Sequence, residues 1–544
     1  MKSAIASDAV PDTTVTNGDA LRTLVGALQD PSRYPHPATA IEVLETHISF
    51  VVLAGEFAYK LKKPVDLGFL DFRTLAARRH FCEEELRLNR RTAPGLYLEV
   101  LPIAGRTDAP VLGGDGSPIE YALKMRRFSQ QFLLDRMARE RTLTPAHIDQ
   151  LAAVVAAFHA RVERADGASP FGTAPQVLAP ALQNFDQVAA LAGTARTLED
   201  LAALRAWTVE EHERRIEAIE RRRLEGFVRE CHGDLHLGNI ALIEGMPVPF
   251  DCIEFDAQLR WTDVIGEIAF LVMDLLDHGL PTLSWRSLDA YLQATGDYAG
   301  VELLRFFLVY RAMVRAKIAL IRDRQAHTSD ADCTGPKSAF RAYLDLALGL
   351  SRSARPAIVL MHGLSGSGKT TIAQPLLETL GAIRVRSDVE RKRLHGLAPA
   401  ARTGAAVESG LYAPAVSAET YRRLATLATG MVRAGWPVLV DATFLRRADR
   451  ESFRALAGCE SVPFMIVSCQ APEATLRARV MAREREARDA SEAGLAVLER
   501  QLSAQEPLAA DELADAITVT TDTGAASPGL AIAEIARRIL PGAG

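Results

Sequence analysis

Residues 363–371, GLSGSGKTT, carry a glycine-rich motif whose residue types suit phosphate binding. The segment matches G-x-x-x-x-G-K-[ST] with Gly363, Gly368, Lys369 and Thr370. Glycines let backbone N–H groups turn toward phosphate oxygens, and a helix that starts there directs its positive end at them. The lysine neutralises the β- and γ-phosphates, and the threonine hydroxyl is a Mg²⁺ ligand. The motif therefore predicts an ATP site formed by Gly363, Ser365, Gly366, Ser367, Gly368, Lys369, Thr370 and Thr371.

Three more residues follow apolar runs that are typical of strands. Asp441 ends the run VLVD, where its carboxylate is expected in the metal shell, and Asp388 follows RVRS, three residues before Arg391. Asp388 is a candidate to accept the proton of an acceptor hydroxyl, and Arg391 to hold an acceptor phosphate or carboxylate. The alternative is that Asp388 is the N-cap of the next helix, and the two roles are compatible.

Arg479 and Arg483 are four residues apart in a segment rich in helix formers, so they share one face of the predicted helix. Arginines on a lid helix stabilise the charge of a transferring phosphoryl group. The alternative is a surface helix whose arginines pair with Glu484 and Glu486. Residues 357–540 resemble the small P-loop kinases of the gluconate kinase, adenylylsulfate kinase and polynucleotide kinase type.

A second group of candidate residues lies in HGDLHLGNI, residues 232–240. Asp234 precedes Asn239 by five residues, which is the interval of the protein-kinase catalytic loop, where the aspartate serves the acceptor hydroxyl and the asparagine binds Mg²⁺. Asp251 follows at a predicted strand end and is expected to bind the same metal. His232 and His236 form an H-x-x-x-H pair, but a loop rather than a helix is predicted there, which disfavours a metal site.

The sequence of this segment resembles the aminoglycoside phosphotransferase and choline kinase-like family, with the strongest similarity over residues 228–275. The resemblance implies small-molecule hydroxyls as acceptors. It also implies that Lys60, in Ala-x-Lys, reaches the ATP phosphates, with Lys62 on the same strand face as the alternative. Glu85 is the expected helix partner of this lysine, with Glu84 as the alternative. No G-x-G-x-x-G is present, and the corresponding strands hold only Ala54-Gly55-Glu56.

The elements that must position these residues change character at SRSARP, residues 351–356, which we interpret as a linker. Residues 1–20 are expected to be a disordered tail. Residues 21–350, the kinase-like half, combine strands with long helical stretches, and the family resemblance implies an α+β bilobal kinase-like domain there. Residues 357–544, the P-loop half, alternate four apolar runs with helices, which predicts an α/β P-loop NTPase domain with a mainly parallel sheet. Together the halves resemble bacterial bifunctional proteins that fuse an aminoglycoside phosphotransferase-like domain to a P-loop kinase or AAA-type ATP-binding domain.

The composition is that of an ordinary globular protein, with 48% hydrophobic and 24% charged residues among 544. The net charge of −5 gives no electrostatic basis for binding bulk nucleic acid or an anionic membrane. Six cysteines without metal-ligand spacing, and no apolar leader, indicate a cytoplasmic protein. We therefore expect an ATP- and Mg²⁺-dependent phosphotransferase acting on small-molecule hydroxyls or nucleotides. The alternative is a regulatory ATP-binding protein with one sensing domain. The sequence carries no signal for an oligomeric state.

Overall fold

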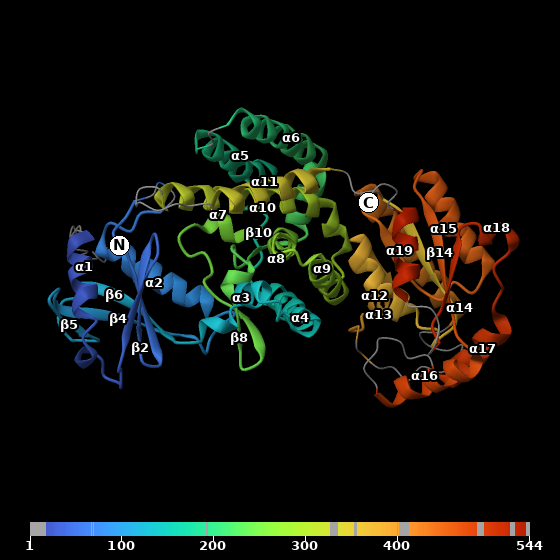
Figure 1. Cartoon of the computed structure of the whole chain (residues 1–544), viewed down its shortest axis with the longest axis horizontal. Coiled ribbons are helices and arrows are strands. Elements are labelled where there is room, and N and C mark those ends of the chain that lie inside the picture. Colours follow the sequence, from blue (N-terminus) through green and yellow to red (C-terminus); the bar gives the residue numbers. More distant parts are fainter. Residues whose placement is uncertain are drawn as a thin grey trace, which may run out of the picture. The chain divides into compact units, whose positions relative to one another are not determined.

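The structure is a computed structural model of the whole chain (Figure 1). It describes residues 18–66, 68, 70–191, 194–326, 336–352, 356–399, 401, 413–486, 494–522 and 528–539. Residues 1–17 of the expected tail and residues 353–355 of the expected linker lie outside these ranges. No helix within the described ranges is long and apolar enough to cross a membrane.

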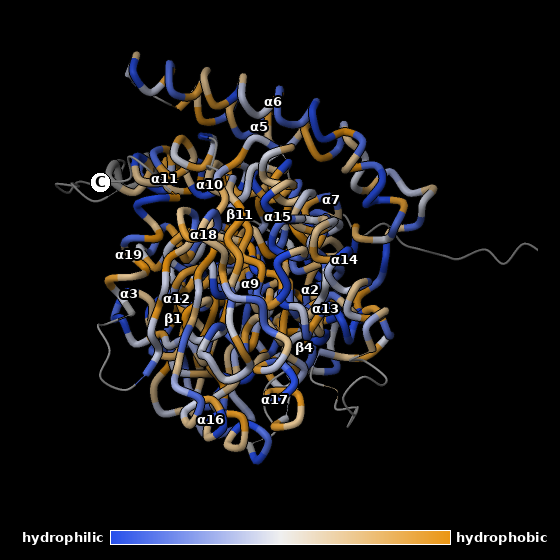
Figure 2. The backbone as a smooth tube through the Cα atoms, turned by 90° about the vertical axis from the view of Figure 1, so that its right-hand side faces the viewer, coloured by the Kyte–Doolittle hydropathy of each residue, from blue (hydrophilic) through white to orange (hydrophobic). Residues whose placement is uncertain are grey.

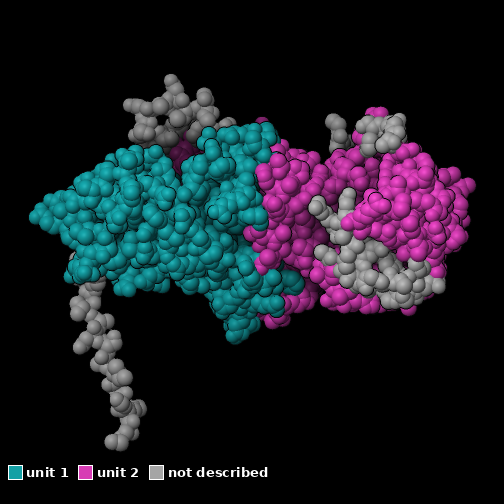
Figure 3. Space-filling model, turned by 90° about the horizontal axis from the view of Figure 1, so that it is seen from below, with its two compact units in different colours: residues 1–143, 158–172, 226–267 teal, residues 144–157, 173–225, 268–544 magenta. Residues whose placement is uncertain are grey.

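The chain forms two compact units (Figure 3). Unit 1 takes residues 1–143, 158–172 and 226–267, and unit 2 takes residues 144–157, 173–225 and 268–544. Unit 2 thus groups the helices after residue 268 with the P-loop half. The domain limits 21–350 and 357–544 stay a prediction.

Unit 1 is built on a six-stranded antiparallel sheet of order β1-β2-β3-β6-β4-β5. Apolar side chains of one face, among them Val52, Tyr59 and Ala122, form a core with α1 (Gly18–Ala27). The opposite face carries Lys60, directly across from Leu123 in the register. The strands are β1 (Ile41–Glu45), β2 (Ser49–Ala54), β3 (Phe57–Lys62), β4 (Tyr97–Arg106), β5 (Ala109–Leu112) and β6 (Glu120–Arg126).

The remaining elements of unit 1 hold the segment with the kinase-like motif. Helix α2 (Leu75–Asn89) starts at Thr74, whose hydroxyl accepts the N–H of Ala77 as an N-cap. The strands β7 (Val228–Glu230) and β10 (Trp261–Asp263) pair antiparallel, and so do β8 (Ile240–Ile243) and β9 (Met246–Pro249). The short helices are α3 (Leu134–Arg139) and α7 (Ala257–Arg260).

Unit 2 begins with helices that continue the kinase-like half. Helix α6 is amphipathic, as the alternating hydropathy along its tube shows in Figure 2. Helices α4 and α8 have residues in both units. The helices are α4 (Pro145–Arg161), α5 (Ala174–Leu191), α6 (Ala195–Leu224), α8 (Val264–Asp277), α9 (Pro281–Thr295), α10 (Val301–Ala326) and α11 (Pro336–Ser351).

The rest of unit 2 is a five-stranded parallel sheet of order β12-β13-β11-β14-β15. The four apolar runs became β11 (Ile358–His362), β12 (Ile383–Arg386), β13 (Val438–Asp441) and β14 (Phe464–Gln470), which confirms the α/β prediction. The tube of β11 is orange in Figure 2, in keeping with four buried residues out of five. The fifth strand, β15 (Ala516–Thr520), was not anticipated.

Helices connect these strands, as expected for a parallel sheet. Because β11, β12 and β13 are parallel neighbours in the sheet, their carboxyl ends lie at one edge, where open α/β sheets bind ligands. The helices are α12 (Lys369–Leu380), α13 (Ser387–Leu394), α14 (Pro414–Arg433), α15 (Arg447–Cys459), α16 (Glu473–Glu486), α17 (Leu495–Ala504), α18 (Ala510–Leu513) and α19 (Pro528–Ile539).

Candidate functional site

The glycine-rich motif forms the turn between β11 and α12, and its glycines are sterically required. Gly363, Gly366 and Gly368 have φ values of +139°, +82° and +80°. A Cβ on Gly363 would lie 2.4 Å from the carbonyl oxygen of Cys469. Only glycine fits such positions without strain. The backbone is therefore shaped for a ligand at the N-terminus of α12.

Lys369 is the first residue of α12, and its Nζ donates to the carbonyl oxygens of Gly363 and Leu364, both at 2.8 Å. Burial lowers the pKa of Lys369, although Asp441 partly opposes this effect. The Thr370 hydroxyl donates to Asp441 Oδ2 over 3.1 Å. The geometry thus brings together the hydroxyl and the carboxylate expected to hold Mg²⁺.

A cavity of about 760 Å³ opens at this edge of the parallel sheet. Its wall includes the turn, the end of β13, the start of α13 and one face of α16. The residues that the sequence nominated for this site and that line the cavity are Ser365, Gly366, Gly368, Lys369, Thr370, Thr371, Asp388, Arg391, Asp441, Arg479 and Arg483. Gly363 and Ser367 belong to the same turn but are not among the lining residues.

Asp388 lies in the first turn of α13, and its Oδ1 accepts a hydrogen bond of 2.7 Å from Arg391 Nη1. The N-cap of α13 is Arg386, so the alternative interpretation of Asp388 as an N-cap is wrong. A carboxylate with a guanidinium one turn away, both at the cavity wall, suits an acceptor group that carries a hydroxyl.

Arg479 joins the lid helix α16 to the phosphate turn. Its Nη1 donates to the carbonyl oxygen of Gly366 over 3.3 Å, and its Nη2 donates to that of Thr521 over 2.6 Å. Arg477, by contrast, pairs on the surface with Glu473 and Glu499. The surface-helix alternative therefore describes Arg477 and not Arg479.

Among the cavity residues that sequence reasoning missed, Arg386 and Gln501 contact the nominated groups. Arg386 is the last residue of β12 and lies directly before Ser387-Asp388. Its Nε is 3.7 Å from Asp441 Oδ2. Gln501 of α17 accepts the backbone N–H of Ser365 over 2.8 Å. Nothing in the sequence near Gln501 signals this contact, because it depends on how α17 packs.

In unit 1, Lys60 lies between two carboxylates. Its Nζ is 2.7 Å from Glu85 Oε1 and 2.7 Å from Asp251 Oδ1. Burial alone lowers the pKa of Lys60, but Asp251 and Glu85 together raise it well above its ordinary value. The lysine therefore stays charged, as a phosphate-binding lysine must.

The alternatives for this lysine and its partner have different surroundings. Lys62 is fully buried and contacts Glu85 Oε2 at 2.7 Å, together with Glu254, a residue that no sequence motif singled out. Glu84 instead pairs with Arg87 and Arg260. The geometry favours Lys60 and Glu85 for the nucleotide, with Lys62 as a buried support beneath them.

The segment 232–239 and the segment 250–253 are held together by backbone contacts. Phe250 N–H donates to the Asn239 carbonyl oxygen over 2.9 Å, and Ile253 N–H donates to that of His232 over 3.1 Å. The Asn239 amide donates to Asp234 Oδ2 over 2.9 Å. Asp251 adopts φ +64°, an unusual conformation for a residue other than glycine. Such strain is common where a side chain must face a ligand.

His232 and His236 support this loop. His232 Nε2 lies 2.8 Å from the Phe250 carbonyl oxygen, and His236 Nδ1 accepts the N–H of Gly238 over 3.0 Å. Neither belongs to a metal-like cluster among the described residues. Their hydrogen bonds explain both histidines without a metal.

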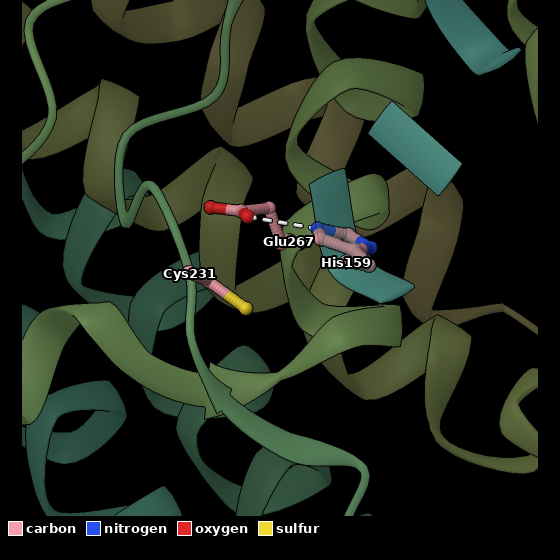
Figure 4. A group of neighbouring side chains, drawn as sticks. All are labelled: His159, Cys231 and Glu267. Atoms are coloured by element: carbon pink, nitrogen blue, oxygen red, sulfur yellow. Dashed lines mark hydrogen bonds and ion pairs between the residues drawn. The ribbon is translucent and has the colours of Figure 1, made fainter. Parts of the chain in front are cut away.

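Glu267, on α8, anchors the same loop, and Figure 4 shows its carboxylate facing His159. Its carboxylate accepts the backbone N–H groups of His232 and Gly233 over 3.0 and 2.7 Å, and lies 2.9 Å from His159 Nε2. Burial raises the pKa of Glu267, but His159 and the His232 N–H outweigh it and bring the pKa to about 2. With Cys231 nearby this group has metal-like spacing, yet its donors already satisfy the carboxylate. An acid inside an apolar helix was the signal that sequence reasoning overlooked.

The sheet face that carries Lys60 also carries Leu53, Ala58 and Met125, paired in register. A cavity of about 610 Å³ adjoins it, lined by Leu44, Leu53 and residues 126–131 after β6. The Ala54-Gly55-Glu56 segment turns from β2 to β3. The turn from β1 to β2, where kinases place a glycine-rich loop, is Thr46-His47-Ile48 and has no glycine.

The fold joins an N-terminal antiparallel sheet and its helices to a C-terminal parallel α/β domain that carries a P-loop. A family model described as an AAA domain matches residues 358–508. The chain is 31% identical over 456 residues to the uncharacterized protein Rv2004c of Mycobacterium tuberculosis, covering 82% of this chain and 88% of the relative. The uncharacterized protein Mb2027c of Mycobacterium bovis matches equally. The chain belongs to the family of these mycobacterial proteins.

Two solved structures resemble parts of the chain. A choline kinase from Cryptosporidium parvum is 12% identical, with 60% of this chain and 96% of that chain covered and a TM-score of 0.37. A gluconokinase from Sinorhizobium meliloti is 20% identical, with 35% of this chain and 91% of that chain covered and a TM-score of 0.24.

Proposed function

We propose that the chain is an ATP- and Mg²⁺-dependent phosphotransferase with two sites, each transferring the γ-phosphoryl group to a hydroxyl of a small molecule or a nucleotide. The observation that carries the proposal is the single cavity shared by Lys369, Thr370, Asp388, Arg391 and Asp441. It combines a phosphate turn, a metal-binding pair and a carboxylate suited to an acceptor, which is the set of groups that phosphoryl transfer needs.

In the P-loop site, Thr370 and Asp441 would hold Mg²⁺, which when bound neutralises charge between the β- and γ-phosphates. Asp388 accepts the proton of the acceptor hydroxyl as its oxygen bonds to the γ-phosphorus and the bond to the β–γ bridging oxygen breaks, releasing ADP. Arg391 orients the acceptor. Arg479 and Arg483 stabilise the phosphoryl charge from α16.

In the kinase-like site, Lys60 holds the ATP phosphates and is oriented by Glu85. Asn239 and Asp251 would hold Mg²⁺, and Asp234 receives the acceptor proton. The carboxylates and amide involved lie on segments joined by the hydrogen bonds of His232 and Phe250. Turnover at the kinase-like site therefore depends on binding ATP without a glycine-rich turn.

That missing turn supports one alternative, in which the kinase-like site senses ATP and the P-loop site does the chemistry. Labelled γ-phosphate transfer to a panel of hydroxyl metabolites separates the two proposals. We expect Lys369→Ala and Asp251→Asn each to remove part of the transfer. If Asp251→Asn leaves all transfer intact while ATP still binds to unit 1 residues, the sensing alternative holds. If neither substitution changes transfer, both sites are misassigned.

A further inference from the structure

Helix α9, which belongs to the kinase-like half of the sequence, packs on the P-loop half within unit 2. The Asp289 carboxylate pairs with Arg384 of β12, with 2.6 Å from Nη2 to Oδ2 and 3.3 Å from Nε to Oδ1. Both side chains are 4% exposed. The same Nη2 donates to Gln374 Oε1, on α12, over 2.8 Å. A buried ion pair of this kind is costly to break by removing one partner.

Gln293 lies one turn after Asp289 on α9 and adds contacts to the same segment. Its Nε2 donates to Asp289 Oδ2 over 2.6 Å, and its Oε1 accepts from Arg386 Nη1 over 3.5 Å. Its carbonyl oxygen accepts from Arg393 Nη2 over 2.7 Å. Asp388 and Arg391 lie on α13. They are preceded by Arg384 and Arg386 on β12 and followed by Arg393 in the last turn of the helix. Helix α9 thus contacts residues just before the start of α13 and a residue near its C-terminal end.

The contacts of α9 extend to the metal-binding pair. Arg384 and Arg386 alternate along β12 and therefore point to the same side of the strand. Arg386 also lines the cavity, and its Nε lies 3.7 Å from Asp441 Oδ2. Gln293 thus holds the guanidinium group that stands beside the carboxylate expected to bind Mg²⁺.

Aromatic contacts fix the other end of the phosphate helix. The Trp285 ring lies against Gly381, just after α12, where a Cβ would be 2.9 Å from ring atom Cε2. The rings of Trp285 and Trp436 have centroids 5.8 Å apart, and Trp436 Nε1 donates to the Val301 carbonyl oxygen over 3.0 Å. Because α12 begins with Lys369, the packing of α12 against α9 also affects the position of the phosphate turn.

We propose that Asp289 and Gln293 are positioning residues of the P-loop site. They hold β12 and α13 so that Arg386 comes no closer to Asp441 than the present 3.7 Å and so that Asp388 and Arg391 face the acceptor. This proposal rests on the proposed phosphotransfer at the P-loop site. It makes α9 a required part of that site, although α9 precedes the expected linker.

The test uses the full chain with Asp251→Asn, which silences the kinase-like site. Gln293→Leu removes both side-chain contacts at a half-buried position, and Asp289→Ala removes the ion pair. Asp289→Asn keeps a hydrogen-bond acceptor for Arg384. Glu120→Gln is the matched control, because Arg78 and Glu120 form an equally buried pair in unit 1. Melting temperature, Mg-ATP affinity by calorimetry and ADP formation from ATP are measured, with glycerol, gluconate, ribose and AMP present as acceptors.

We expect the affinity for Mg-ATP to fall by no more than about fivefold for Gln293→Leu while ADP formation falls by about tenfold or more, because small displacements of catalytic groups are costly. Asp289→Ala should lose more, and Asp289→Asn should recover part of the rate. Glu120→Gln should lower the melting temperature without changing ADP formation. The proposal is overturned if Gln293→Leu turns over like the parent chain, or if all variants lose rate in proportion to their melting temperatures.

A parent chain that binds Mg-ATP without forming ADP would refute phosphotransfer alone. The positioning proposal is then judged by the Mg²⁺ concentration that half-saturates ATP binding. Gln293→Leu releases Arg386 toward Asp441, so this concentration should rise by about threefold or more. An unchanged Mg²⁺ requirement would overturn the positioning role.

Discussion

Lys60 and Asp251 lie 191 positions apart in the chain, yet their side chains form an ion pair of 2.7 Å. The pair joins the sheet of unit 1 to the segment that follows the kinase-like loop. The two charged groups are in direct contact, so a phosphate and a cation that bind here have to separate them. We therefore expect substitutions of the acidic residues around Lys60 to affect ATP binding and phosphoryl transfer differently.

The first prediction separates Asp251 from Asp234. In a Lys369→Ala background, Asp251→Asn should weaken Mg-ATP binding to unit 1 residues, since it removes a metal ligand. Asp234→Asn should leave binding nearly unchanged but lower phosphoryl transfer by ~10²–10⁴-fold, the usual worth of a general base. Calorimetry and labelled transfer measure the two effects. Asp108→Asn, at an exposed surface pair, is the control. Equal loss of ATP affinity in both variants would contradict these roles.

The second prediction distinguishes Lys60 from Lys62. Lys60→Ala should weaken ATP binding with little loss of stability, because Glu85 keeps Lys62 as a partner. Lys62→Ala leaves Glu85 and Glu254 buried with less compensation, so the free energy of unfolding should fall by about 3–5 kcal/mol. Denaturant unfolding and nucleotide titration of both variants check this. The assignment fails if Lys62→Ala is as stable as the wild type and Lys60→Ala binds ATP normally.

The third prediction concerns pH. The pKa of Glu267 is lowered from its ordinary 4.5 to about 2, because the hydrogen bonds from His159 and His232 outweigh burial. A depressed carboxyl pKa stabilises the fold fully above about pH 4.5, and that contribution is lost as the pH falls toward 2. Glu267→Gln should therefore be less stable at pH 7, by about 2–3 kcal/mol, and its stability should vary less between pH 4.5 and 2.

Circular dichroism melts across that pH range, with Glu199→Gln on the exposed side of α6 as control, test this expectation. Identical acid limbs for the wild type and Glu267→Gln would show that the carboxylate is not the group that titrates. Phosphoryl transfer at the kinase-like site should fall as well, because the two backbone N–H groups that Glu267 holds belong to the loop of Asp234.

What the sequence predicted well was local. The phosphate turn has fixed spacing between its glycines and Lys369, and the first four of the five residues of β11 are apolar, so both can be recognised without knowledge of distant packing. Glu267 and Arg386 were missed because their roles depend on side chains that only the tertiary fold brings near. The strand β15 escaped because AITVT is short and only one of its five residues is fully buried apolar. The packing of α9 against β12 corresponds to no local sequence pattern.

The fourth prediction tests the acceptor groups of the P-loop site. In an Asp251→Asn background, Lys369→Ala should abolish nucleotide binding. Asp388→Ala should keep ATP binding but lose transfer, and Arg391→Ala should mainly raise the acceptor KM. Arg477→Ala, which removes the surface pairs of Arg477 with Glu473 on α16 and Glu499 on α17, is the control. Transfer and phosphate release to water are measured together. If Asp388→Ala releases phosphate as fast as the parent and no transfer occurs in either, the kinase assignment of this half is wrong.

The fifth prediction concerns the expected linker. Trp436 is 4% exposed because Trp285, Arg305 and Val301 cover it, and all three precede residue 351. A fragment of residues 357–544 would expose this tryptophan and leave Arg384 without Asp289. We expect that fragment to melt at lower temperature than the full chain and to bind Mg-ATP more weakly. A protease site inserted within residues 353–355 provides the control, since cutting the intact protein there breaks one peptide bond but no contact of α9. The two pieces should still elute together in gel filtration and keep the affinity of the uncut chain. Pieces that separate, with full Mg-ATP affinity in the C-terminal one, would establish independent domains and remove α9 from the P-loop site.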